Sequence, residues 1–226
     1  MLQRWSWMLV GIAALTAVSA AGAQRPGAAP ESKAEADARI ARRGAGLMVG
    51  MWSLLDDPAS GSATTTDSPI GEGYFRRGLD RHLALETTAG VFRRVIEQPA
   101  TGGLGGSAGG TTTALLIPQM TSLKLYPFTG PEQALEPFVS GGLGVTLGIV
   151  SESGSGGLLG GSGGVSGMVA GVGGSLGAGI EWRFSTAFGL TAGGHYTYIQ
   201  FFEDLAGERM YRGTGVRVGM TYRFQY

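Results

Sequence analysis

The final stretch of the sequence, Gly213 to Tyr226, alternates residue by residue between two kinds of side chain. Successive side chains on a β-strand point to opposite faces, so this pattern predicts a strand with one apolar face. The apolar row consists of Thr214, Val216, Val218, Met220, Tyr222, Phe224 and Tyr226. The other row consists of Gly213, Gly215, Arg217, Gly219, Thr221, Arg223 and Gln225. A period of two excludes a helix here, because a helix repeats every 3.6 residues.

Three earlier segments, 139–149, 175–184 and 188–198, repeat this alternation. In each of them one row is largely apolar, while the other holds mostly glycine, serine and threonine with an occasional larger polar residue. The outward face of a soluble β-sandwich would carry more charge than these rows do. Small side chains instead suit the crowded interior of a narrow barrel whose apolar rows face lipid. The pattern therefore predicts a transmembrane β-barrel.

Aromatic residues stand at both ends of the expected strands. The set at one rim is Trp182, Phe184, Phe188, Tyr222, Phe224 and Tyr226, and the set at the opposite end is Tyr196 and Tyr198. The interval from Phe188 to Tyr198 is roughly 33 Å of strand, or about 25 Å of height once the strand is tilted by about 40°. That height matches the apolar band of an outer-membrane barrel. We expect these residues to form its two aromatic girdles.

The whole sequence yields eight such segments, among which 70–78 is the least regular because Tyr74 to Arg77 does not alternate cleanly. The expected strands are 45–55, 70–78, 83–95, 112–126, 137–150, 174–184, 187–201 and 213–226. Their connections are alternately long and short. The fold class predicted is all-β, an eight-stranded antiparallel up-and-down transmembrane barrel with short periplasmic turns and longer extracellular loops.

Three parts follow one another along the chain. Arg4, the apolar run Met8–Ala20 and the small residues Ala21-Gly22-Ala23 predict a signal peptide over residues 1–23. An uncleaved anchor is the alternative, but the run is shorter than the ~20 apolar residues that a spanning helix needs. Residues 24–44 are expected to form a periplasmic leader, with one short helix near 32–43. The barrel is predicted over residues 45–226.

Composition excludes several other classes of protein. Of the 17 basic residues, Arg4 leaves with the signal peptide, so 16 basic residues face 17 acidic ones, and no nucleic-acid partner is expected. The absence of cysteine excludes disulfide and thiolate chemistry. The 42 glycines show no Gly-X-Y repeat, which excludes collagen. Their runs also lack the Gly-Lys-Ser/Thr of a phosphate-binding loop. We expect neither a cofactor nor a metal.

Several stretches resemble the small outer-membrane β-barrel superfamily, which includes the OmpA transmembrane domain, OmpX, OmpW and the opacity-type surface proteins. The resemblance covers Ala45–Tyr226 and rests on the segments Leu123–Phe128, Pro137–Gly144 and Val216–Phe224. It implies a location in the outer membrane, with lipid and lipopolysaccharide around the barrel. It also implies that the C-terminal strand is read by the barrel-insertion machinery. We expect the protein to be a monomer.

Six charged residues fall on the rows that should face the lumen. They are Glu86, Lys124, Glu181, Arg183, Arg217 and Arg223. Isolated charges are costly in such an interior, so we expect them to pair into a cluster. The cluster could act as a selectivity filter or as a structural plug. We favour a plug, because an eight-stranded barrel is only just wide enough for its own side chains.

His195 and Thr197 also fall on the lumen row, with Glu203 and Glu208 further along the chain. An eight-stranded lipid A deacylase uses a similar histidine and serine, two residues apart, together with a downstream glutamate. Here threonine stands in place of that serine, and a nucleophile, base and orienting acid must also lie within hydrogen-bond reach. We therefore interpret His195 as a hydrogen-bonded structural residue.

The glycine-rich segment 151–173 also carries six large apolar residues, among them Leu158 and Met168. We interpret it as a flexible surface loop, with an extended hairpin or a partly apolar lid as alternatives. The function that follows is a structural or surface-interaction barrel with a filled lumen. A narrow channel for small or apolar solutes, which a resemblance to OmpW implies, is the alternative. A lipid A-modifying enzyme is the remote third.

Overall fold

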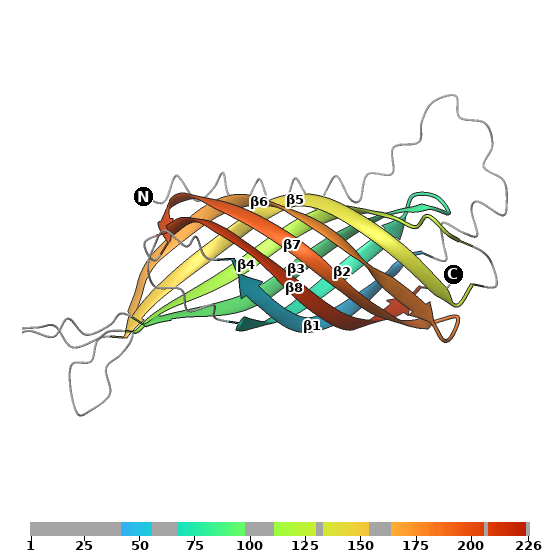
Figure 1. Ribbon diagram of the computed structural model, residues 1–226, viewed down its shortest axis with the longest axis horizontal. Coiled ribbons are helices and arrows are strands. Elements are labelled where there is room, and N and C mark those ends of the chain that lie inside the picture. Colours follow the sequence, from blue (N-terminus) through green and yellow to red (C-terminus); the bar gives the residue numbers. More distant parts are fainter. Residues whose placement is uncertain are drawn as a thin grey trace, which may run out of the picture.

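The computed structural model describes residues 42–55, 67–97, 111–129, 133–153, 164–205 and 208–224, and these form a closed barrel of eight antiparallel strands (Figure 1). The strands are β1 (Gly44–Leu54), β2 (Asp67–Gly78), β3 (Leu83–Glu97), β4 (Thr111–Leu125), β5 (Leu135–Ser153), β6 (Gly164–Arg183), β7 (Phe188–Leu205) and β8 (Glu208–Arg223). Each pairs with its neighbours in sequence, and β1 also pairs with β8. The predicted fold class and strand number are confirmed. Among the described residues, no helix is long and apolar enough to span a membrane.

The two rows of each strand face opposite sides of the wall, as the alternation predicts. On β8, Val216, Val218 and Met220 are each more than half exposed on the outer surface, while Thr221 is buried in the lumen. The lumen rows hold small residues because the backbone and the large side chains of the neighbouring strands leave little room. A Cβ added at Gly46 would lie 2.6 Å from the Tyr74 ring, and one added at Gly179 would lie 2.7 Å from Phe138. Glycine thus makes room for the few large side chains inside.

Strand β2, the least regular in the sequence, has a regular alternation in the structure. Its inward row includes Glu72, Tyr74 and Arg76, while Phe75 points outward and is half exposed. The strand also begins at Asp67 rather than at residue 70. The sequence pattern was obscured because Arg76 carries a charge inside the barrel and Arg77 carries one on the outer row.

The described parts of the segment 151–173 are strand, so its interpretation as a flexible loop is wrong for these parts. β5 continues to Ser153 and β6 already begins at Gly164, which matches the extended-hairpin alternative. Residues 154–163 lie outside the described residues. Glycine is compatible with a strand here because the neighbouring strand supplies the bulk: a Cβ added at Gly171 would lie 2.9 Å from the ring of Phe201, its pairing partner on β7. The predicted 202–212 loop is likewise mostly strand, since β7 ends at Leu205 and β8 begins at Glu208.

Short turns close the opposite end of the barrel. In the β2–β3 turn, the Asp80 carboxylate accepts hydrogen bonds from the backbone N–H groups of His82 (2.6 Å) and Leu83 (2.7 Å). In the β6–β7 turn, the Ser185 hydroxyl accepts one from the Phe188 N–H at 2.8 Å. These side chains satisfy backbone donors that the strand ladder leaves free.

A chain of aromatic contacts runs along the outside of this rim. It links Trp182, Phe184, Phe188, Tyr222 and Phe224, with ring centroids 5.4–6.5 Å apart. Of the predicted opposite girdle, Tyr196 is exposed and Tyr198 is half-buried. Tyr226 lies outside the described residues, as do the predicted signal peptide and residues 24–41. Gly44, which was placed in the leader, is the first residue of β1.

Replacing Val218 by arginine should lower the free energy of unfolding by about 2–4 kcal/mol, because a charge near the middle of the lipid-facing surface is poorly solvated. Val218 is 57% exposed on that surface and pairs with Val49 and Ala192. The measurement is urea unfolding from lipid vesicles, with Val218→Ile as the matched apolar control. Equal stability of the arginine and isoleucine variants would mean that this row does not face lipid.

Candidate functional site

The lumen at the short-turn end is filled by a network of buried charges centred on Arg76. Its Nε and Nη2 donate hydrogen bonds to Glu86 Oε2 at 2.9 and 2.8 Å, and its Nη1 donates to Glu181 Oε2 at 2.5 Å. Lys124 Nζ also donates to Glu86 Oε2, and Arg223 Nη2 donates to Glu181 Oε1, each at 2.8 Å. These five residues, which we call the ionic plug, come from β2, β3, β4, β6 and β8. They therefore join strands from all around the barrel.

The ionic plug contains three cations and two carboxylates. Aromatic rings face the excess positive charge. Lys124 Nζ lies 4.1 Å from the centre of the Phe138 ring, and the Arg76 guanidinium carbon lies 5.3 Å from that of Tyr74. The Tyr126 hydroxyl donates a further hydrogen bond to Glu181 at 3.2 Å. Cation–π attraction strengthens where water is excluded, so these rings help to hold a charged network in a narrow interior.

Two of the six charges expected in one cluster lie elsewhere. Arg217 donates a hydrogen bond to Glu72 Oε2 at 2.7 Å, and the two form a separate ion pair nearer the outer end of the lumen. Arg183 lies at the short-turn rim, where it contacts Glu136 at 3.1 Å and the Gln133 carbonyl oxygen at 2.5 Å. Glu86, Lys124, Glu181 and Arg223 are brought together. Glu181 pairs with Thr191 and Thr191 with Gly219, so Arg217 and Arg223 lie on opposite sides of this level along β8. Arg223, on the short-turn side, binds Glu181, whereas Arg217, on the outer side, binds Glu72.

Several charged and aromatic residues of the lumen escaped the sequence analysis. They are Arg42, Glu72, Tyr74, Arg76, Tyr126 and Glu136. A strict period-two reading of β2 from Ser68 would have placed Glu72, Tyr74 and Arg76 inside. Arg42 and Glu136 were assigned to a leader and to a turn, and no period in the sequence marks them as lumen residues.

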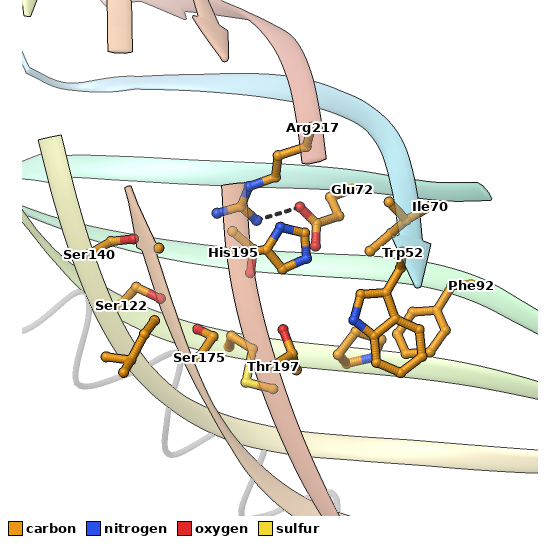
Figure 2. A pocket seen from close by; sticks show the side chains of 15 residues that line it. Trp52, Ile70, Glu72, Phe92, Ser122, Ser140, Ser175, His195, Thr197 and Arg217 are labelled. Carbon is orange, nitrogen blue, oxygen red and sulfur yellow. Dashed lines mark hydrogen bonds and ion pairs between the residues drawn. The ribbon is translucent and has the colours of Figure 1, made fainter. Parts of the chain in front are cut away.

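A polar chamber lies in the middle of the lumen, next to the ionic plug on the side of the outer end. Figure 2 shows His195 and the Arg217–Glu72 ion pair on one side of it and Ser122, Ser140 and Ser175 on the other. Its volume is about 30 Å³. This is the space open to the centres of water-sized molecules, so the chamber can hold ordered water against its polar groups.

Some buried polar atoms around the middle of the lumen have no hydrogen-bond partner among the described residues. They include Trp52 Nε1, Thr146 Oγ1 and His195 Nδ1. The interpretation of His195 as hydrogen-bonded is therefore wrong for Nδ1. Its ring instead packs on the backbone of β8, where a Cβ added at Gly215 would lie 2.7 Å from a ring carbon. Trp52 and His195 line the chamber, where small polar molecules such as water could pair with these atoms.

The residues of the deacylase-like set do not form a catalytic arrangement. His195 and Thr197 are both buried on the lumen side of β7, whereas Glu203 is exposed further along the strand. Among the described residues, no carboxylate binds His195 Nδ1 to orient the imidazole as a general base. Within the described ranges, no group of three or more histidine or acidic residues could hold a metal ion.

Apolar side chains fill the outer end of the lumen. We call this cluster the apolar plug; it consists of Trp52, Leu54, Ile70, Phe92, Ala114, Leu116, Met120, Val150, Ile199, Phe201, Leu205 and Tyr211. The Trp52 and Phe92 rings lie 4.4 Å apart, and the Phe201 and Tyr211 rings 5.3 Å apart. The Tyr211 hydroxyl donates to the Leu205 carbonyl oxygen at 2.5 Å, so its polar end is also satisfied. The chamber is thus bounded by a plug at each end.

No protein-family model matches the sequence, and no curated protein matches it either. Solved structures do match. The chain is similar to Neisserial surface protein A, with 14% identity and a TM-score of 0.56 over 80% of this chain and 97% of that one. It is also similar to Ail, the attachment invasion locus protein of Yersinia pestis, with 15% identity and a TM-score of 0.51 over 81% and 98% of the two chains. The chain has the fold of the small eight-stranded outer-membrane barrels.

Replacing Arg76 by methionine should lower the free energy of unfolding by about 3 kcal/mol, because two buried carboxylates lose their shared partner. The loss should stay near the lower end of the range for broken buried pairs, since Lys124 and Arg223 remain. Arg209→Met is the control: its ion pair with Asp204, at 2.6 Å, is well exposed and should contribute less than about 1 kcal/mol. Equal, small losses in urea unfolding for both variants would show that the ionic plug does not stabilise the barrel.

Proposed function

We propose that this protein acts in the outer membrane as a structural or surface-interaction barrel whose lumen is closed. The observation that supports this most directly is the pair of plugs, ionic at the short-turn end and apolar at the outer end. Only about 30 Å³ of chamber separates them. A solute would have to displace both plugs to cross the barrel.

Each plug resists displacement for its own physical reason. Moving Arg76 aside would leave Glu86 and Glu181 poorly compensated in a low-dielectric interior, where an unpaired charge is strongly unfavourable. Moving Trp52 or Phe92 aside would transfer large buried aromatic surfaces into water. A channel alternative would require such a rearrangement, and we therefore place it second.

The outer end offers the surface on which such a protein could act. β7 contains 18 residues, which correspond to roughly 60 Å of strand and about 45 Å of height. That height exceeds the ~25 Å apolar belt of an outer-membrane barrel by about 20 Å. Phe202 and Met210 are 64% and 50% exposed near the outer ends of β7 and β8. An interaction role fits this projecting wall, and one structural neighbour is named for attachment.

The remaining partners in this proposal follow from the barrel surface. The outward rows would contact outer-membrane lipid, and the projecting wall would meet lipopolysaccharide. The last strand, with Phe224 at its end, would be the segment that the insertion machinery reads. Because closure leaves no free sheet edge, the barrel needs no second copy to satisfy its backbone, and we propose a monomer.

We propose no enzymatic activity for the barrel. The arrangement of His195, Thr197 and Glu203 supports this, because the histidine and the acid do not share a hydrogen bond. Replacing His195 should leave the acylation of lipid A in the surrounding membrane unchanged.

Reconstituted into planar bilayers, the unmodified protein should show no steady ion conductance at neutral pH, because both plugs are in place. Heat-modifiable migration on gels verifies that the sample is folded. Replacing Glu181 and Arg217 together should not open a defined pore, because these residues belong to different ion pairs and the apolar plug remains. Large, uniform conductance steps from the unmodified protein would contradict the closed-lumen proposal and favour the channel alternative.

A further inference from the structure

The residue that leads into β1 reaches across the short-turn end of the barrel. Arg42 lies two positions before Gly44, the first residue of β1. Its side chain nevertheless contacts Tyr126 at the end of β4 and Glu136 in β5. In a closed barrel of eight strands in sequence order, β5 lies opposite β1. The Arg42 side chain therefore bridges two sides of the mouth.

The Arg42 guanidinium uses both its face and its edges. Its carbon lies 3.8 Å from the centre of the Tyr126 ring, in cation–π contact. Nη2 and Nη1 donate to the two carboxylate oxygens of Glu136 at 3.1 and 3.4 Å, and Nε donates to the backbone carbonyl oxygen of Arg81 at 2.9 Å. The side chain is only 9% exposed. A planar group with a ring on its face and a bidentate carboxylate is held in a single orientation.

The groups beneath Arg42 lead directly to the ionic plug. Tyr126 is buried in a small cluster with Ala84 and Phe138, and its hydroxyl donates to Glu181. Glu136, on the same layer as Arg42, also binds Arg183 at 3.1 Å. The order from the mouth inward is therefore Arg42 with Glu136, then Tyr126 with Ala84 and Phe138, then the ionic plug.

We propose that Arg42 is a latch that closes the short-turn mouth, on the side of the ionic plug that faces away from the chamber. This inference rests on the proposed closed lumen and adds a further closing layer at the short-turn mouth. The latch belongs to the segment before the first strand, so it can open without breaking any strand pair of the barrel. Opening would expose the cluster of Ala84, Tyr126 and Phe138 to water. A force or a partner acting on the N-terminal segment could thereby reach the ionic plug through Tyr126.

The absence of cysteine from the sequence permits a clean chemical test. A single cysteine is introduced in place of Ala84, which is fully buried beneath the latch. The refolded protein in lipid nanodiscs is treated with a water-soluble maleimide, and the labelling rate is followed by mass spectrometry. Leu79→Cys, at a position 46% exposed in the neighbouring turn, gives the rate for an open site. Each variant is first checked for heat-modifiable migration.

Removing the latch should expose the buried cysteine. We expect Arg42→Ala to raise the labelling rate of Cys at position 84 about tenfold, and Glu136→Gln to raise it in the same direction, through more frequent local opening. Arg81→Ala is the matched control. It removes the same charge from the same rim but keeps the backbone carbonyl that Arg42 binds, so the rate should not change. Equal rates in the Arg42→Ala and Arg81→Ala backgrounds would overturn the latch.

A second measurement needs no cysteine and covers the case in which Ala84→Cys does not fold. Tryptic cleavage after Arg43 is compared between the Arg42→Ala and Arg81→Ala proteins. Faster cleavage in the first supports the latch, and equal cleavage overturns it. Conductance measurements separate the two proposals. If the protein conducts ions but the labelling rate at position 84 still depends on Arg42, the closed lumen is refuted and the latch is kept.

Discussion

Hydrogen bonding between the first and last strands is the interaction on which the rest of this structure depends. β1 pairs with β8 from Gly44↔Arg223 to Leu54↔Gly213, so no strand edge is left in the wall. In lipid, each unpaired backbone group would cost several kcal/mol, and closure is the only way for strands to avoid that cost. Closing at eight strands also fixes a narrow interior. Side chains must then fill it, and most lumen positions must be small.

The filling differs along the barrel axis. Charged groups from five strands interlock at the short-turn end, and aromatic and aliphatic groups pack at the outer end. The ionic plug depends on every partner, because an unpaired charge there is far more costly than an absent one. The apolar plug depends on contact area and tolerates adjustment better. The polar chamber lies where the two kinds of filling meet.

Much of the fold could be predicted from the sequence. A two-residue period of apolar side chains indicates both that a segment is a strand and which of its side chains face outward. The pairing of side chains could not be predicted, because it depends on tilt and register. Arg217 shares a row with Arg223 but binds Glu72, because it lies nearer the outer end of β8 than Arg223, which binds Glu181. The inward position of Arg76 could not be recognised in the sequence, because the next residue, Arg77, is also charged but lies on the outward row. The glycines after residue 164 have little strand propensity of their own, and their pairing with β5 and β7 decides their conformation. Arg42 precedes any periodic segment, so only the three-dimensional structure reveals its role.

The closed lumen can be tested most directly with Trp52, which belongs to the apolar plug and also lines the chamber. After Trp182→Phe, Trp52 is the only tryptophan beyond residue 7. In the folded protein without residues 1–23, iodide quenching of tryptophan fluorescence then measures the accessibility of this one indole. Its exposed fraction is 1%, so a closed lumen predicts quenching at least about tenfold weaker than in the urea-unfolded chain. Quenching as strong as in the unfolded chain would reveal a water-filled path to the middle of the barrel and contradict the account.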